Sequence, residues 1–273
     1  MKLLSKIVTP FKEDGLVDYS LIKEILDLAF LNCADGIVIN GEYGEANYIK
    51  KEELILFIKE VRKNTSLPIY VELSPTNVYD LMYIMDKIKD VNNLFLIFDL
   101  PDKPHLRQSD IFIYVKNIVK GERIPFFVKN GGNNFLSFFS IKKIEKAFPY
   151  FKGIIESTND KNLINLIKTK LPNLEVYVED NYEIEKLYER NIDGICSSIS
   201  LMFGKEIKSI IEDYKFGIVS SFMNSYINYI YDSLSSLSFL SMKYLLSRKI
   251  GKEIFPSKFY QKVENVNIEI DET

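Results

Sequence analysis

The sequence predicts a closed (β/α)8 TIM barrel of parallel strands, an α/β fold, followed by a helical C-terminal extension. Three observations lead to this prediction. Eight short strand-like apolar runs occur before residue 204, a helical pattern fills each gap between neighbouring runs, and no strand-like run follows them. Strands that alternate with helices are joined by right-handed parallel crossovers, and eight such units are what a closed barrel requires.

Each of the eight runs is short and almost continuously apolar, which is typical of parallel strands covered on both faces. In chain order the runs are residues 3–9 (LLSKIVT), 36–40 (GIVIN), 69–73 (IYVEL), 94–98 (LFLIF), 125–129 (PFFVK), 153–157 (GIIES), 175–179 (EVYVE) and 194–198 (GICSS). An open doubly wound sheet is the weaker interpretation, because no dinucleotide-binding glycine fingerprint follows the first run.

The gaps between the runs carry amphipathic helical patterns, such as residues 18–32 (DYSLIKEILDLAFLN) and 50–64 (KKEELILFIKEVRKN). After residue 204 only helical patterns remain, the longest of them over residues 220–251. We therefore assign residues 1–204 to the barrel and residues 205–273 to C-terminal helices packed on it, as one structural unit.

Composition limits the possible functions of the chain. Its 273 residues are 47% hydrophobic and 27% charged, which is ordinary for a globular protein, and the formal net charge of −3 gives no reason to expect a nucleic-acid partner. No apolar run approaches the roughly 20 residues of a membrane span, and the first residues are too short in their apolar part for a signal peptide. Cys33 and Cys196 stand far apart in apolar contexts, which favours free thiols and a cytoplasmic location.

In (β/α)8 barrels, function lies at the carboxyl ends of the strands. The residues at the ends of the eight runs are polar and mostly acidic: Thr9, Pro10, Asn40 to Glu45, Glu72, Ser74, Asp99, Lys129, Asn130, Glu156, Ser157, Glu179, Asp180, Ser197 and Ser198. Because strand side chains alternate, some of these carboxylates, Glu156 above all, are expected to face the helix layer. The glycine-bearing loop from Asn40 to Glu45 can turn backbone N–H groups toward a ligand anion.

Residues 7–45, IVTPFKEDGLVDYSLIKEILDLAFLNCADGIVINGEYGE, resemble the N-terminal signature of the dihydrodipicolinate synthase and N-acetylneuraminate lyase family of class I aldolases, which includes 2-keto-3-deoxygluconate aldolases. The similarity continues through FFVKN, GIIEST and DGICSSIS, so it covers the barrel. It implies a (β/α)8 barrel with C-terminal helices and a homo-oligomer, a tetramer or a dimer. It also implies a small-molecule partner, a 2-oxo acid or sugar acid, and no cofactor.

The chain departs from the family pattern where the family places its chemistry. Family members form a Schiff base through a lysine that ends strand six, and Ile155 stands at that position. Lys129 stands where the family has a proton-shuttling tyrosine, and Glu42 and Tyr43 replace the paired threonines that bind the substrate carboxylate. The arginine that receives a carboxylate in some members falls near Asn134.

Three hypotheses follow. The first is aldolase-type or lyase-type carbon–carbon chemistry on a 2-oxo acid with Lys129 as the catalytic residue, although imine formation needs a neutral amine and lysine has an ordinary pKa of about 10.4. The second is a catalytically inactive homologue that serves as a small-molecule-binding or scaffold protein. The third and weakest is a lyase assisted by Mg²⁺ bound to the carboxylates, so no metal site is assigned. The predicted substrate-binding residues are Gly41, Glu42, Tyr43, Gly44, Asn130 and Ser197.

Overall fold

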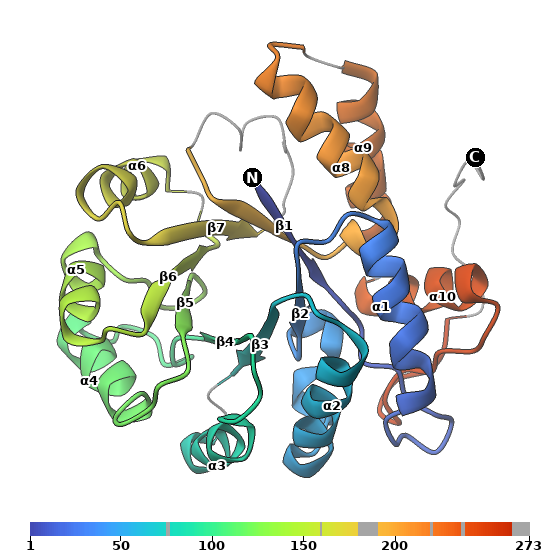
Figure 1. The fold of residues 1–273 in the computed structure, drawn as a ribbon, viewed down its shortest axis with the longest axis horizontal. Coiled ribbons are helices and arrows are strands. Elements are labelled where there is room, and N and C mark those ends of the chain that lie inside the picture. The colour runs from blue at the N-terminus through green and yellow to red at the C-terminus, as the bar shows by residue number, and fades with distance from the viewer. Residues whose placement is uncertain (75–76, 159, 180–190, 219–220, 236–237, 264–273) are drawn as a thin grey trace.

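The computed structural model describes residues 1–74, 77–158, 160–179, 191–218, 221–235 and 238–263. Its eight parallel strands pair in chain order, and the last pairs with the first, so the predicted closed barrel is confirmed (Figure 1). The strands are β1 (Lys2–Lys6), β2 (Gly36–Ile39), β3 (Ile69–Leu73), β4 (Leu94–Phe98), β5 (Phe126–Asn130), β6 (Phe151–Glu156), β7 (Glu175–Glu179) and β8 (Gly194–Ser197).

Helices occupy the gaps between the strands in the described part of the chain. They are α1 (Ile22–Leu31), α2 (Lys51–Asn64), α3 (Val78–Ile88), α4 (Gln108–Ile118), α5 (Phe138–Ala147) and α6 (Lys161–Lys170), with short 3-10 turns at η1 (Tyr19–Leu21), η2 (Glu42–Gly44) and η3 (Ala46–Tyr48). Side chains of Asn77, Ser137 and Asp160 accept hydrogen bonds from backbone N–H groups in the first turns of α3, α5 and α6, as helix N-caps do. Most of the gap between β7 and β8, with Asp180, lies outside the described residues.

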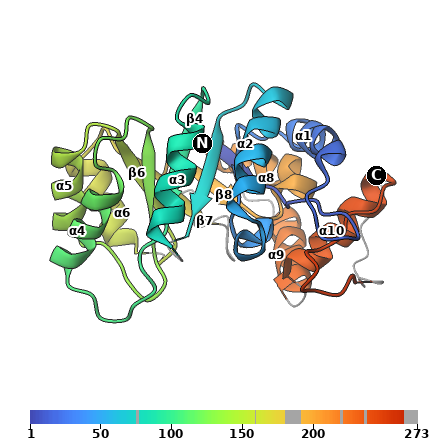
Figure 2. The ribbon, with the colours of Figure 1, turned by 90° about the horizontal axis from the view of Figure 1, so that it is seen from below.

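Three helices follow the last strand: α8 (Ser200–Lys215), α9 (Ser221–Ser235) and α10 (Ser238–Ile250). Helix α8 packs on β1 and α1, and a Cβ at Gly204 would lie 2.0 Å from the Asn32 carbonyl oxygen, so only glycine allows this approach. The predicted division after residue 204 falls inside α8, beside Phe203, where the backbone leaves helical geometry (φ −123°, ψ 26°). Figure 2 shows α9 and α10 on the α1 side, away from α4, α5 and α6. None of the described helices combines the length and apolar character that a membrane span requires.

The barrel interior is a packed core with one residue from every strand. This inner layer consists of Leu4, Val38, Tyr70, Ile97, Phe127, Ile155, Tyr177 and Cys196. Its aromatic rings fill the centre: Tyr70 stacks on Phe95 with ring centroids 4.8 Å apart, and Phe127 meets Tyr177 edge-on at 5.6 Å. A second, larger cluster of buried residues lies between the strands and the helices. The interior is therefore solid beneath the carboxyl ends of the strands.

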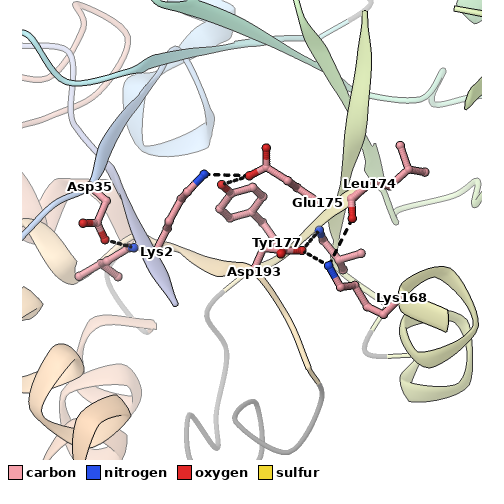
Figure 3. Close-up of polar contacts among 9 residues, drawn as sticks. Lys2, Asp35, Lys168, Leu174, Glu175, Tyr177 and Asp193 are labelled. Carbon is pink, nitrogen blue, oxygen red and sulfur yellow. Dashed lines mark hydrogen bonds and ion pairs between the residues drawn. The ribbon is translucent and has the colours of Figure 1, made fainter. Parts of the chain in front are cut away.

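Polar contacts cover the amino ends of the strands (Figure 3). The Lys2 ammonium lies 2.9 Å from the Glu175 carboxylate, which also accepts a hydrogen bond of 2.7 Å from the Tyr177 hydroxyl. Lys168 of α6 pairs with Asp193 at 2.7 Å, and Asp193 accepts a second bond from the backbone of β7. Because these contacts join β1, β7, α6 and the start of β8, they stabilise the closure of the barrel.

Candidate functional site

The polar site at the carboxyl end follows directly from the inner apolar layer. Side chains of a strand alternate, so the residue two positions beyond each inner-layer residue also faces the barrel axis. These inward-facing positions are Lys6, Asn40, Glu72, Asp99, Lys129, Ser157, Glu179 and Ser198. Two lysines and three carboxylates thus crowd the mouth of the barrel, directly above the aromatic core.

Lys129 is held between two carboxylates. Its Nζ lies 2.9 Å from Glu72 Oε1 and 2.9 Å from Glu179 Oε1, and its side chain is 24% exposed. Burial lowers the pKa of Lys129, but the charges of Glu72 and Glu179 together outweigh burial and raise it above the ordinary lysine value. The amine of Lys129 is therefore an ammonium at neutral pH.

Glu179 is shared by two lysines. The same Oε1 that contacts Lys129 also pairs with Lys6, and Oε2 accepts a 2.6 Å hydrogen bond from the Ser157 hydroxyl. Burial raises the pKa of Glu179, but Lys6 and Lys129 pull it well below the usual range. Sequence reasoning missed Lys6 because it placed the end of the first strand at Thr9, whereas β1 ends at Lys6.

Asp99 has a different environment from the other two carboxylates. Its Oδ2 accepts a 2.6 Å hydrogen bond from the Ser74 hydroxyl, whereas its Oδ1 is buried without a hydrogen-bond partner among the described residues. Burial, and then the negative charge of Glu72, raise the pKa of Asp99 to about 6, against the opposing effect of Lys129. Asp99 is thus a carboxyl group that changes its protonation state close to neutral pH.

A cavity of about 490 Å³ opens over this group of side chains. Its walls come from η3, the ends of β3, β4 and β5, and the loops that follow β4 and β5: Asn47, Ser74, Asp99, Leu100, Pro101, Asp102, Lys129, Gly131, Gly132 and Asn133. Lys129 is therefore both the partner of a buried and a half-buried carboxylate and part of the cavity wall. A volume of this size accommodates a small organic acid.

The loop from Gly41 to Glu45 supports the mouth instead of lining the cavity, whose wall takes Asn47 from this region. A Cβ at Gly41 would lie 2.4 Å from Glu72 Oε2, so glycine lets this loop approach the carboxylate that holds Lys129. The Thr9 hydroxyl donates a hydrogen bond of 2.7 Å to the Gly44 carbonyl oxygen. Glu42 is exposed, and Tyr43 packs half-buried against the outer core.

Two predicted substrate-binding residues turn away from the barrel axis, because alternate positions of a strand face opposite sides. Asn130 donates to Glu156 Oε2 at 2.6 Å and accepts from the Leu136 N–H at 2.6 Å. Ser197 Oγ accepts from the Ser200 N–H at 3.0 Å. Glu156 faces the helix layer, as the alternation predicts. Asn130 and Ser197 thus hold strand ends to the segments that follow them.

No group of three or more His, Cys, Asp or Glu side chains in the described part of the chain is arranged to hold a metal ion. The one histidine of the chain, His105, lies in the exposed loop after β4 with a left-handed backbone (φ 62°). Each of the three carboxylates of the mouth forms an ion pair with a lysine or accepts a hydrogen bond from a serine hydroxyl.

The closed barrel and the charged cavity at its carboxyl end define a (β/α)8-barrel protein with a cavity of small-molecule size above the strand ends. Residues 1–246 match the model of the dihydrodipicolinate synthetase family, and the chain belongs to this family. Ile155, which the sequence resemblance aligns with the Schiff-base lysine of the family, is 2% exposed in the apolar inner layer and pairs in register with Lys129 on the neighbouring strand.

Individual relatives agree with this assignment. The chain is 26% identical over 212 residues to a 4-hydroxy-tetrahydrodipicolinate synthase of Hydrogenobaculum sp. (strain Y04AAS1), covering 75% of this chain and 72% of the relative. Its fold is similar to 2-keto 3-deoxygluconate aldolase from Picrophilus torridus, with a TM-score of 0.85, 17% identity, and coverage of 98% of this chain and 99% of the other. N-acetylneuraminate lyase from Fusobacterium nucleatum gives a TM-score of 0.85 at 16% identity, covering 96% and 93%.

Proposed function

We propose that this protein carries out aldolase-type carbon–carbon lyase chemistry on a small 2-oxo acid or sugar acid, with the Lys129 amine as the nucleophile that forms the Schiff base. One observation carries the proposal: Lys129 faces the barrel axis, lines the cavity, and is the register partner of Ile155. Neighbouring strands lie about 4.8 Å apart, so an amine on β5 reaches the region that an amine on β6 would serve.

The surroundings of Lys129 determine when it can react. Imine formation needs the neutral amine, and the charges of Glu72 and Glu179 favour the ammonium. Their oxygens, each 2.9 Å from Nζ, hold the proton on the amine. The fraction of neutral amine therefore increases with pH into the alkaline range, and so does the rate of imine formation.

The names of the relatives support the class of reaction. The synthase, the aldolase and the lyase with which the chain was compared are all named for reactions that make or break a bond in a small molecule. The chain resembles the synthase in sequence and the aldolase and the lyase in fold, while replacing the residues by which the family holds its substrate. We therefore propose the 2-oxo acid or sugar acid class and no single member of it.

A second candidate function is a catalytically inactive homologue that binds a small molecule or serves as a scaffold. Two observations favour it. Both carboxylates closest to Lys129 hold its amine in the charged form, and Ile155, Glu42 and Tyr43 stand where the family has its lysine and threonines.

Reductive trapping separates the two candidates. Borohydride in the presence of pyruvate is expected to attach the ligand covalently to Lys129, increasingly from pH 7 to about pH 10, where even an ordinary lysine is partly neutral. Mass spectrometry of the digested protein should locate the adduct, and Lys129→Ala should abolish it. Lys6→Ala is the matched control, because it removes the other lysine that contacts Glu179. No adduct up to pH 10 with any of a panel of 2-oxo acids would leave the inactive homologue as the function.

We also propose a homo-oligomer, a tetramer or a dimer, in the cytoplasm. The apolar stretch from Ser233 to Leu246 does not support an interface between subunits, because side chains such as Met242 and Leu246 are buried within the chain. Support comes instead from exposed aromatic side chains, Phe139 at 80% and Tyr79 at 83%, which mark candidate interfaces. Light scattering at micromolar concentration should give a multiple of the 31.8 kDa chain mass, and a monomer would contradict the proposal.

A further inference from the structure

Asp99 is a carboxyl group of the cavity wall next to the strand that carries Lys129. Of the carboxylates in the described part of the chain, only Asp99 and Asp102 belong to the cavity wall. Asp102 is exposed and accepts a hydrogen bond from Asn133 in the outer loop. Asp99 lies deeper, at the end of β4, one strand away from Lys129.

The contacts of Asp99 fix its orientation and leave it able to take up a proton. The Ser74 hydroxyl holds Oδ2 at 2.6 Å, while Oδ1 accepts no hydrogen bond from any residue described. The charged and titratable groups that act on it are Glu72 on β3, Lys129 on β5, Glu179 on β7 and Tyr114 on α4, whose hydroxyl is likewise buried without a described partner.

The other two carboxylates of the mouth are unsuited to this task. Glu72 Oε1 is bound to Lys129, and Oε2 lies against Gly41. Glu179 is bound by Lys129, Lys6 and the Ser157 hydroxyl, and its pKa is lowered, so it is a weak base. A general base must hold a proton reversibly near the working pH, and the pKa of Asp99 is about 6.

We propose that Asp99 is the general acid–base residue of the mouth, the group that moves the proton between the reacting carbon of the bound 2-oxo acid and solvent. This inference rests on the function proposed above. In the protonated Schiff base (iminium ion) that pyruvate forms on Lys129, Asp99 removes a proton from C3. The C–H electron pair forms the C2–C3 double bond, and the electron pair of the C–N double bond moves to nitrogen. Return of the proton from Asp99 to C3 regenerates the imine, so atoms and charges balance.

The same exchange of a proton serves bond cleavage in a sugar acid. Asp99 accepts the proton of the C4 hydroxyl as the C3–C4 bond breaks, and the electrons of that bond enter the enamine. Asp99 then returns the proton to C3. The family tyrosine is replaced by Lys129 in this chain, so the proton transfer requires another group, and Asp99 is the deeper carboxyl of the cavity wall.

Hydrogen–deuterium exchange of the pyruvate methyl group tests this role without the natural substrate. Protein, pyruvate and D2O are followed by proton NMR, and the exchange rate is divided by the amount of imine trapped with borohydride under the same conditions. Asp99→Asn should trap pyruvate as the wild type does, yet its exchange per imine should fall by about 100-fold or more. The matched control, Asp86→Asn, changes an exposed carboxylate of α3 outside the cavity wall and should keep the wild-type exchange.

The pH dependence distinguishes proton transfer from a structural role. Exchange per imine in the wild type should increase as pH rises through about 6, where Asp99 loses its proton, and Asp99→Asn should lose this step. Ser74→Ala removes the hydrogen bond that lowers the pKa of Asp99, so the step should move to higher pH. If Asp99→Asn traps pyruvate normally and exchanges the methyl protons at the wild-type rate per trapped imine, the role of Asp99 is overturned and the proposed function stands. Failure to trap pyruvate on the wild type would overturn the proposed function and this inference with it.

Discussion

The buried ion pair between Glu45 and Lys243 gives the sharpest prediction about stability. Lys243 on α10 is 1% exposed and Glu45, in the turn after β2, is 3% exposed. Lys243 also donates to the Phe255 carbonyl at 3.0 Å, and its ammonium lies 4.6 Å from the centre of the Phe11 ring. Glu45 Oε2 accepts from the Ser257 N–H at 2.9 Å. This one pair joins the β2 turn to the C-terminal helices.

The magnitude follows from burial. Lys243→Met leaves a carboxylate inside the protein without its counter-charge, and removing one partner of a buried ion pair costs about 3–5 kcal/mol. Adding Glu45→Gln removes that charge, so the double variant should recover about 2 kcal/mol relative to Lys243→Met. Burial outweighs the attraction of Glu45 and lowers the pKa of Lys243 to about 8, so keeping the pair charged is itself costly.

Urea denaturation followed by far-ultraviolet circular dichroism measures these changes, with the protein concentration held constant because association would add to apparent stability. The lowered pKa of Lys243 adds a second expectation. Between pH 8 and 10.5 the unfolded chain holds a proton that the folded chain has lost, so the free energy of unfolding should increase with pH in wild type relative to Lys243→Met. A cost below 1 kcal/mol for Lys243→Met, or a double variant no more stable than it, would refute the reasoning.

Three further predictions concern the mouth of the barrel. Asp99→Asn should raise the free energy of unfolding at pH 7 by at most about 3 kcal/mol. A carboxyl group whose pKa is raised to about 6 stabilises the fold below pH 3.8 and loses that contribution as pH rises through 6. Equal urea midpoints for the variant and the wild type at pH 7 would contradict this. Gly41→Ala should cost about 1–3 kcal/mol, since its Cβ would lie 2.4 Å from Glu72 Oε2, and unchanged thermal unfolding would contradict it. Lys129→Met should lower urea stability by a few kcal/mol at pH 7, because Glu72 and Glu179 lose a counter-charge, and a neutral effect would argue that water compensates them.

The barrel could be predicted from the sequence because parallel strands covered on both faces leave a direct record of apolar runs. Three of the runs, residues 69–73, 94–98 and 175–179, coincide with the observed strands. The first run was extended to Thr9 because Ile7 and Val8 are as apolar as a strand, yet both are buried beyond the end of β1. Because the predicted strand ended three residues too late, Lys6 was not included among the strand-end residues.

The candidate site was predicted in part, and its limits have physical causes. The place of Lys129 at a strand end predicted that it lies at the mouth of the barrel. The direction in which the side chains of Asn130 and Ser197 point depends on the register of the closed barrel, which the sequence of a single strand does not reveal. The pairing of Lys243 with Glu45 joins residues 198 positions apart in the chain. No local pattern marks such a pair, although a lysine within an apolar helical stretch is a signal that it is buried with a partner.

Placing the lysine at Lys129 instead of at Ile155, as the resemblance implies, changes the electrostatics around the amine. The two positions are register partners on neighbouring strands. At Ile155 a lysine would enter the apolar inner layer, where burial favours the neutral amine that a Schiff base requires. At Lys129 it meets Glu72 and Glu179, which favour the ammonium. The Schiff-base chemistry proposed here would therefore begin with the transfer of a proton away from Lys129, and the carboxylates around it determine the pH at which that happens.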